Sequence, residues 1–164
     1  MAIPTTVRFY AAMVGGLRDG GLLRNPASDP GVAWDAMGAP RILIADDQEG
    51  HRKLLDLLLS IDGYDIAMVE DGREALGWLQ LNTPDLAILD VAMPFMNGIE
   101  VAERIRRVSR LKDVKVIVLT AVRDERTREA ARMAKVDALV FKPLEGKDFR
   151  SVVKAVLAGE PQTV

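Results

Sequence analysis

The chain has 164 residues, of which 49% are apolar and 28% charged, with a formal net charge of -2. These values fit one domain with a full core, and the near-zero charge gives no strong field to attract nucleic acid or an anionic membrane surface. With no cysteine and a single histidine, the chain cannot form disulfides, thiolate sites or a histidine metal cluster. It has no secretory signal pattern and no apolar run near the roughly 20 residues that cross a bilayer. We therefore expect a cytoplasmic protein without nucleic-acid or membrane partners.

Residues 1–39 differ in composition from the rest of the chain, because six glycines and three prolines fall among them. Such residues disfavour packed helices and strands, so we expect a flexible N-terminal extension, in which residues 5–14 could form a turn or two of helix. Met37 stands just before the first regular segment. We therefore also consider that this leader is a start-site artefact, which an intact mass of the natively expressed protein that includes residues 1–36 would contradict.

From residue 41 the sequence alternates between apolar runs and amphipathic segments. Five apolar runs are typical of buried strands, and they cover residues 41–45, 64–69, 85–90, 114–120 and 138–141. Five segments with helical periodicity follow them, at residues 49–60, 73–81, 99–108, 123–135 and 147–158. In the first helix we expect the buried stripe to consist of Leu54, Leu55, Leu58 and Leu59.

This alternation predicts βαβ units that form a parallel sheet with helices on both faces. Because crossovers between parallel strands are right-handed, few topologies remain. The common solution for five strands is the flavodoxin-like, doubly wound (βα)5 fold with strand order 2-1-3-4-5. We therefore predict this α/β fold.

In that strand order the first and third strands end side by side, which brings Asp46, Asp47 and Asp90 together. Each acid alone is equally well explained as a turn or helix-capping residue. Three carboxylates at one edge repel one another unless a cation neutralises them, and oxygen ligands suit Mg²⁺. Thr120 and Lys142 end the fourth and fifth strands at the same edge, and together the five residues supply what phosphoryl transfer needs.

Over about residues 40–158, these motifs in this order resemble the receiver domain of two-component response regulators. The motifs are Asp46-Asp47, Asp71-Gly72 with Glu74-Ala75-Leu76, Asp85 through Gly98, Thr120-Ala121 and Lys142-Pro143. The resemblance implies a stand-alone receiver domain between the extension and a C-terminal stub of residues 159–164.

The resemblance also implies a role for each matching residue. Asp90 is the implied phosphoacceptor, served by a sensor histidine kinase or a histidine phosphotransfer protein. The implied Mg²⁺ ligands are Asp46, Asp47, Asp90 and the backbone carbonyl of Ala92. The implied contacts to the phosphoryl group come from Thr120, Ala121 and Lys142. The implied switch region holds Leu139 and Pro143, and the bond before this proline is commonly cis in the family.

Two departures from the family pattern affect these expectations. Leu139 stands where the family often has Tyr or Phe, and the aromatic Phe141 is adjacent to the lysine instead, so output is expected to rest on helix and loop shifts. Ala92 and Val122 flank the implied acceptor site, and neither side chain can hydrogen-bond an attacking water. We therefore expect slow self-dephosphorylation.

The leading interpretation is a phosphorylation-activated receiver that signals by binding an unidentified downstream protein, and not an enzyme beyond its own phosphoryl transfer and slow dephosphorylation. Whether it forms a homodimer on phosphorylation stays open. The alternative is a phosphorylation-independent adaptor, or pseudo-receiver, on the same fold. A phosphatase is disfavoured because Ala92 occupies the position of the usual second acid, and a nucleotide-binding module because no glycine-rich loop follows the first strand. We expect His51 to be a surface residue of the first helix, with no role as a phosphodonor.

Overall fold

The computed structural model describes residues 39–160 and 162, so the expected N-terminal extension, apart from Ala39, and part of the C-terminal stub lie outside the described residues. Five parallel strands form one sheet in the order β2-β1-β3-β4-β5, which confirms the predicted flavodoxin-like fold. The strands are β1 (Arg41–Ala45), β2 (Asp65–Val69), β3 (Leu86–Asp90), β4 (Lys115–Thr120) and β5 (Ala138–Phe141).

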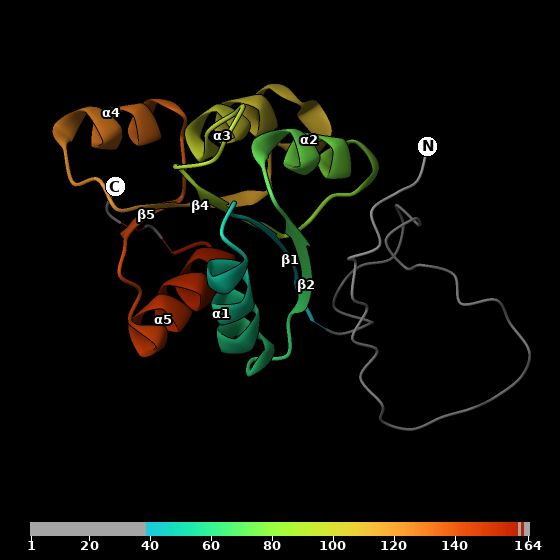
Figure 1. The fold of residues 1–164 in the computed structure, drawn as a ribbon. Coiled ribbons are helices and arrows are strands. Elements are labelled where there is room, and N and C mark those ends of the chain that lie inside the picture. The colour runs from blue at the N-terminus through green and yellow to red at the C-terminus, as the bar shows by residue number, and fades with distance from the viewer. Residues whose placement is uncertain (1–38, 161, 163–164) are drawn as a thin grey trace, which may run out of the picture.

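Helices cover both faces of this sheet, as Figure 1 shows. One face carries α1 (Glu49–Ser60) and α5 (Gly146–Leu157). The other carries α2 (Gly72–Leu81), α3 (Gly98–Arg107) and α4 (Glu125–Met133), and a short 3₁₀ turn, η3 (Ser109–Leu111), follows α3. Among the described residues, no helix has both the length and the apolar character needed to cross a membrane.

The two faces of the sheet build two separate hydrophobic cores. Successive residues of a strand point to opposite faces, so Leu43, Ala87 and Val116 pack under α2, α3 and α4. Their neighbours Ile42 and Ile88 pack under α1 and α5. Because both faces are covered, β1 and β3 are buried along their whole length, which explains their unbroken apolar sequences.

The predicted buried stripe of α1 is partly wrong. Leu55 and Leu59 are buried, but Leu54 is 45% exposed. Arg52 takes a place on the buried face instead, because its guanidinium donates to the backbone oxygen of Asp46 at 2.7 Å and to Glu70 Oε1 at 2.9 Å. The buried face of α1 is therefore formed by Arg52, Leu55 and Leu59.

The fourth helix is shorter than the predicted range 123–135. Its first turn is capped by Asp124, whose side chain accepts a hydrogen bond from the backbone N–H of Thr127 at 2.7 Å. At the other end, Lys135 has a φ of 53°, a left-handed conformation that an α-helix cannot continue through. Local capping and backbone geometry therefore set both ends of α4.

Candidate functional site

Three carboxylates converge at the carboxyl edge of the sheet. Asp90 is the last residue of β3, and Asp46 and Asp47 directly follow the neighbouring strand β1. One carboxylate oxygen from each residue lies within 4.8 Å of the other two. Asp46 and Asp90 are buried, with 0% and 2% of their surface exposed, whereas Asp47 is exposed. The chain thus concentrates negative charge where the sheet opens to solvent.

Backbone contacts hold Asp46 in place at the start of α1. Its Oδ1 accepts a hydrogen bond from the backbone N–H of Gln48 at 2.8 Å, which forms a turn leading into the helix. Its backbone oxygen accepts from the Arg52 guanidinium at 2.7 Å. With these groups satisfied, only Oδ2 of Asp46 faces the cluster.

Lys142, at the end of β5, reaches the cluster from the other side. Its Nζ lies 2.9 Å from Asp90 Oδ1 and 3.0 Å from Asp46 Oδ2. Burial by itself lowers the pKa of the ammonium, but the contacts with Asp90 and Asp46 outweigh burial and raise the pKa above its ordinary value. The Lys142–Pro143 peptide bond is cis. The lysine is therefore a fixed positive charge between two acids.

Asp90 is the least satisfied polar residue of the site. Burial raises the pKa of its carboxyl, the Lys142 ion pair opposes that shift, and the negative charges of Asp46 and Asp47 add to it. Among the residues that the structure describes, its Oδ2 is the buried side-chain polar atom that has no hydrogen-bond partner. A buried carboxylate oxygen without a partner is costly. It fits a ligand position for a divalent cation shared with Asp46 and Asp47.

Thr120 ends β4 beside these acids and is 2% exposed. Its Oγ1 accepts a hydrogen bond from the backbone N–H of Val122 at 3.0 Å. This contact uses a lone pair and leaves the hydroxyl proton free to be donated. The backbone oxygen of Thr120 accepts from Lys142 N at 2.8 Å, so the threonine and the lysine are held in register. The next residue, Ala121, is exposed.

Two glycines allow the loop after β3 to pack closely. A Cβ on Gly98 would lie 2.5 Å from the backbone oxygen of Asp90, and one on Gly72 would lie 2.5 Å from that of Met96. Both glycines open a helix, α3 and α2 respectively. Residues 91–97, which include the exposed Ala92, are therefore clamped between the first turns of two helices.

Phe95, at the tip of this loop, is an unusual residue that the sequence analysis does not identify. It is 71% exposed and has a φ of 66°, which is uncommon for a bulky side chain. The guanidinium of Arg73, on α2, lies 4.2 Å from the centroid of its ring. This cation–π contact ties the loop after β3 to the first turn of α2.

The switch positions take two different environments. Leu139 is buried in the core on the α2, α3 and α4 side of the sheet, whereas Pro143 is exposed. Phe141 is half-buried, and the guanidinium groups of Arg123 and Arg128 each lie 4.8 Å from its ring centroid. The aromatic side chain beside the lysine is thus held by arginines at the start of α4 and in the loop before it.

His51 lies on the first helix with part of its side chain exposed, and it also contacts the site, which we did not expect. It is the third residue of α1, and its side chain is 38% exposed. Its Nδ1 lies 3.0 Å from Lys142 Nζ and 3.3 Å from Asp46 Oδ2. The sequence did hold a signal for this position. The first turn of α1, which contains His51, begins shortly after Asp46 and Asp47, so it lies at the same edge of the sheet as these acids.

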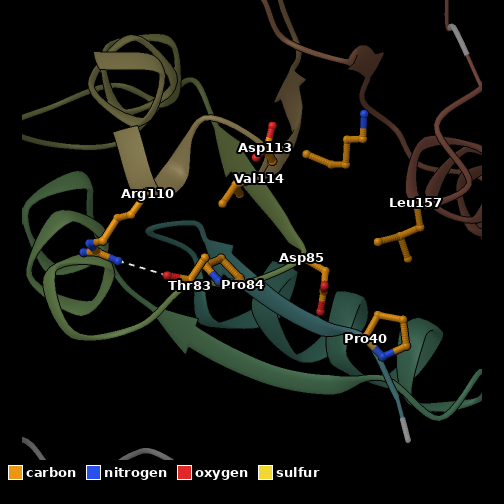
Figure 2. A pocket seen from close by; sticks show the side chains of 9 residues that line it. Pro40, Thr83, Pro84, Asp85, Arg110, Asp113, Val114 and Leu157 are labelled. Carbon is orange, nitrogen blue, oxygen red and sulfur yellow. Dashed lines mark hydrogen bonds between the residues drawn. The ribbon is translucent and has the colours of Figure 1, made fainter. Parts of the chain in front are cut away.

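A pocket of about 330 Å³ lies at the opposite, amino edge of the sheet. Figure 2 shows Pro40, Asp85 and Val114 around it, together with the hydrogen bond from Arg110 to Thr83. These residues precede or begin β1, β3 and β4, whereas the acid cluster lies where strands end. The pocket is therefore separate from the candidate site.

Comparison with known proteins matches the family described as "Response regulator receiver domain" to residues 42–154. "Probable transcriptional regulator ycf27" of Guillardia theta is 38% identical over 117 residues, which are 71% of this chain and 45% of that protein. "Response regulator MprA" of Mycolicibacterium vanbaalenii is 35% identical over 117 residues, 71% of this chain and 50% of that protein. The chain thus spans about half the length of these curated relatives.

A solved structure shows the same likeness in three dimensions. The signal receiver domain of a signal transduction histidine kinase from Syntrophus aciditrophicus has 33% sequence identity and a TM-score of 0.70. The match covers 77% of this chain and 96% of that one.

Proposed function

Because the chain belongs to the response regulator receiver domain family, we propose that it is a phosphorylation-activated receiver whose acceptor is Asp90. The observation that carries this proposal is the buried, unpartnered Oδ2 of Asp90, placed between two further acids and the Lys142 ammonium. We extend the proposal to residues 40–158 as the receiver unit, to a cytoplasmic location, and to a sensor histidine kinase or a histidine phosphotransfer protein as phosphodonor.

The proposed reaction transfers a phosphoryl group from a phosphohistidine to Asp90. A carboxylate oxygen forms a P–O bond while the P–N bond breaks, and the electron pair stays on the imidazole nitrogen, which takes up a proton. Lys142, already 2.9 Å from Asp90 Oδ1, would pair with the new negative charge. Thr120 would donate its free hydroxyl proton to a phosphoryl oxygen, and the backbone at Ala121 would lie against it.

The acids of the site would hold the divalent cation that the reaction needs. Asp46, Asp47 and Asp90 supply carboxylate oxygens close enough to share one ion, and the backbone carbonyl of Ala92 would complete the set. Mg²⁺ is the cation that we propose, since all of these ligands are oxygens. When bound, it neutralises charge that develops on the transferred group.

The proposed output is binding of a downstream protein, and not turnover of a substrate. Since the chain covers about half the length of the relatives named above, the identity of that target is not carried over from them. We propose that phosphorylation changes the α4–β5–α5 surface through helix and loop shifts, since Leu139 is a buried aliphatic residue. Homodimerisation on phosphorylation is a separate outcome that sedimentation of both forms would detect.

The test is intact mass after incubation of the full chain with a small phosphodonor and Mg²⁺. We expect wild type to gain one phosphoryl group, and we expect Asp90→Asn or chelation of the cation to abolish the gain. The matched control is Asp113→Asn, an exposed acid at the amino edge of the sheet, which should be phosphorylated like wild type. Failure of folded wild type to gain mass would favour the adaptor alternative.

The lifetime of the phosphorylated form tests the surroundings of the acceptor. Ala92 and Val122 are exposed beside the site and offer no side-chain hydrogen bond to an attacking water. We expect the phosphoryl group to persist beyond minutes in the absence of a phosphatase, as followed by intact mass over time. We further expect Ala92→Gln to shorten the lifetime, because an amide can orient the water. Loss of the group from wild type within seconds would contradict this prediction.

A further inference from the structure

His51 contacts the site through the ammonium of Lys142. Its Nδ1 lies 3.0 Å from Lys142 Nζ, and the lysine side chain is only 16% exposed. An ammonium has three N–H donors and no acceptor. In this contact the imidazole nitrogen must therefore accept, which requires a neutral ring with its proton on Nε2.

The second contact of the same nitrogen is incompatible with the first. Nδ1 also lies 3.3 Å from Asp46 Oδ2, and a hydrogen bond there would need the proton on Nδ1. One nitrogen cannot accept from Lys142 and donate to Asp46 at the same time. Both partners are ionised groups, but the contact to the ammonium is 3.0 Å and the contact to the carboxylate is 3.3 Å, so the geometry selects the Nε2–H tautomer.

His51 completes the surroundings of the ammonium. Asp90 Oδ1 at 2.9 Å, Asp46 Oδ2 at 3.0 Å and His51 Nδ1 at 3.0 Å give Lys142 three acceptor atoms for its three protons. A largely buried ammonium with fewer partners would be penalised. The imidazole thus favours the position in which Lys142 occupies the acid cluster.

Resting on the proposed function, we propose that His51 is a positioning residue that retains the Lys142 ammonium over the acids until a cation and a phosphoryl group take its place. A cation beside Asp46 and Asp90 repels the ammonium and competes for Asp46 Oδ2. The ammonium then leaves His51 as the cation binds, and it turns toward the phosphoryl group once one is placed on Asp90.

The first test reads the tautomer directly in the full chain. His51 is the one histidine among 164 residues, so the imidazole signals of the ¹⁵N-labelled protein belong to it. At about pH 8.5, where an imidazole is neutral, we expect long-range ¹H–¹⁵N spectra of the metal-free protein to show a bare Nδ1 and a protonated Nε2. In Lys142→Met we expect the proton on Nδ1. A protonated Nδ1 in metal-free wild type overturns the proposal.

The second test measures Mg²⁺ affinity by isothermal titration calorimetry. In His51→Leu the metal-free state loses one hydrogen bond to Lys142 that a cation must otherwise break, so we expect Mg²⁺ to bind about fivefold more tightly than to wild type. His51→Gln retains an acceptor oxygen and should stay close to wild type. The control Leu57→Gln, on the same helix and 66% exposed, should leave the affinity unchanged.

An unchanged affinity in His51→Leu overturns the proposal. If that variant does not fold, the tautomer of wild type decides alone. Neither measurement involves phosphate, so a chain that binds Mg²⁺ but accepts no phosphoryl group would contradict the proposed function and leave the role of His51 standing.

Discussion

Charged residues lie at the strand ends on both edges of the sheet, but the acids of the two edges differ in how fully they are paired with donors and cations. At the amino edge, Asp137 accepts from Arg106 Nη2 at 2.9 Å, from the backbone N–H of Val116 at 2.8 Å and from Lys115 Nζ at 3.3 Å. At the carboxyl edge, Asp46 and Asp90 share the Lys142 ammonium, and one buried oxygen of Asp90 has no partner among the residues that the structure describes. Charge is thus satisfied at one edge and left in excess at the other.

This difference separates structural charge from functional charge. An acid whose oxygens are all paired within the protein stabilises the fold, as Asp137 does by linking α3 to the strands β4 and β5. An acid whose burial raises its pKa and whose oxygen lacks a partner destabilises the fold unless a ligand binds. The Asp90 carboxylate at the carboxyl edge can therefore still bind a cation, whereas the carboxylate oxygens of Asp137 at the amino edge are already paired.

The largest expected effect comes from a steric clash introduced at the carboxyl edge of the sheet. In Gly98→Ala the new Cβ would lie 2.5 Å from the backbone oxygen of Asp90, so the loop after β3 must shift. We expect this variant to lose about 3 kcal/mol of stability, measured by urea unfolding, and to accept phosphate poorly.

Gly77→Ala is the matched control for this substitution. Gly77 is an exposed glycine inside α2, and a Cβ there meets nothing within 4 Å. We expect it to gain about 1 kcal/mol of stability, because alanine favours the helix more than glycine does. Equal effects of the two substitutions would show that crowding at Asp90 is not what requires Gly98.

The second prediction compares one acid from each edge. Asp137→Ala removes the carboxylate that accepts from Arg106 Nη2 and from the backbone N–H of Val116, and we expect a loss of about 2 kcal/mol in stability. Asp90→Asn should act in the opposite direction in metal-free buffer and raise the Tm, because it removes a carboxylate that burial disfavours.

The sign of the Asp90 effect has a definite pH dependence. The raised pKa means that ionisation of Asp90 destabilises the folded state as the pH rises through that pKa. The advantage of Asp90→Asn should therefore be present at neutral pH and vanish below the ordinary carboxyl pKa of 3.8. Thermal unfolding across pH in the presence of a chelator tests this, and a lower Tm for Asp90→Asn at neutral pH would contradict it.

The smallest expected effect concerns an acid outside both edges. Asp62, which follows α1, accepts from Arg150 Nε and Nη2, each at 2.7 Å, and pairs with Lys154 Nζ at 2.8 Å. These partners hold the pKa of its carboxyl far below 3.8. The stability that it contributes is therefore fully present above pH 3.8 and is lost as the pH falls toward its lowered pKa.

Asp62→Asn should accordingly lower the Tm at neutral pH by a small amount, and the difference from wild type should shrink in acid. The substitution is measured by the same pH series as Asp90→Asn, so the two acids are compared directly. Differences from wild type of the same sign at neutral pH would contradict the distinction between paired and unpaired acids.

Much of the fold was predictable from the sequence because local patterns and the global topology agree. The apolar runs gave every strand to within one residue at each end, and the alternation with helices led to the strand order that the structure has. That order placed Asp46, Asp47 and Asp90 at one edge, where the structure brings their oxygens within 4.8 Å. Periodicity and handedness are backbone properties, and a single sequence expresses them directly.

What only the tertiary structure decided depends on side chains from distant segments. His51 and Lys142 are 91 residues apart, and no local pattern predicts that an imidazole will accept from that ammonium. Leu54 is exposed while Arg52 is buried and reaches two oxygens, and the unpartnered Oδ2 of Asp90 is visible only when every described neighbour is in place. The sequence by itself thus determined that Asp46, Asp47, Asp90, Thr120 and Lys142 meet at one edge. Packing decided that His51 joins them and which atoms are satisfied, because hydrogen bonding depends on distances that only the folded chain sets.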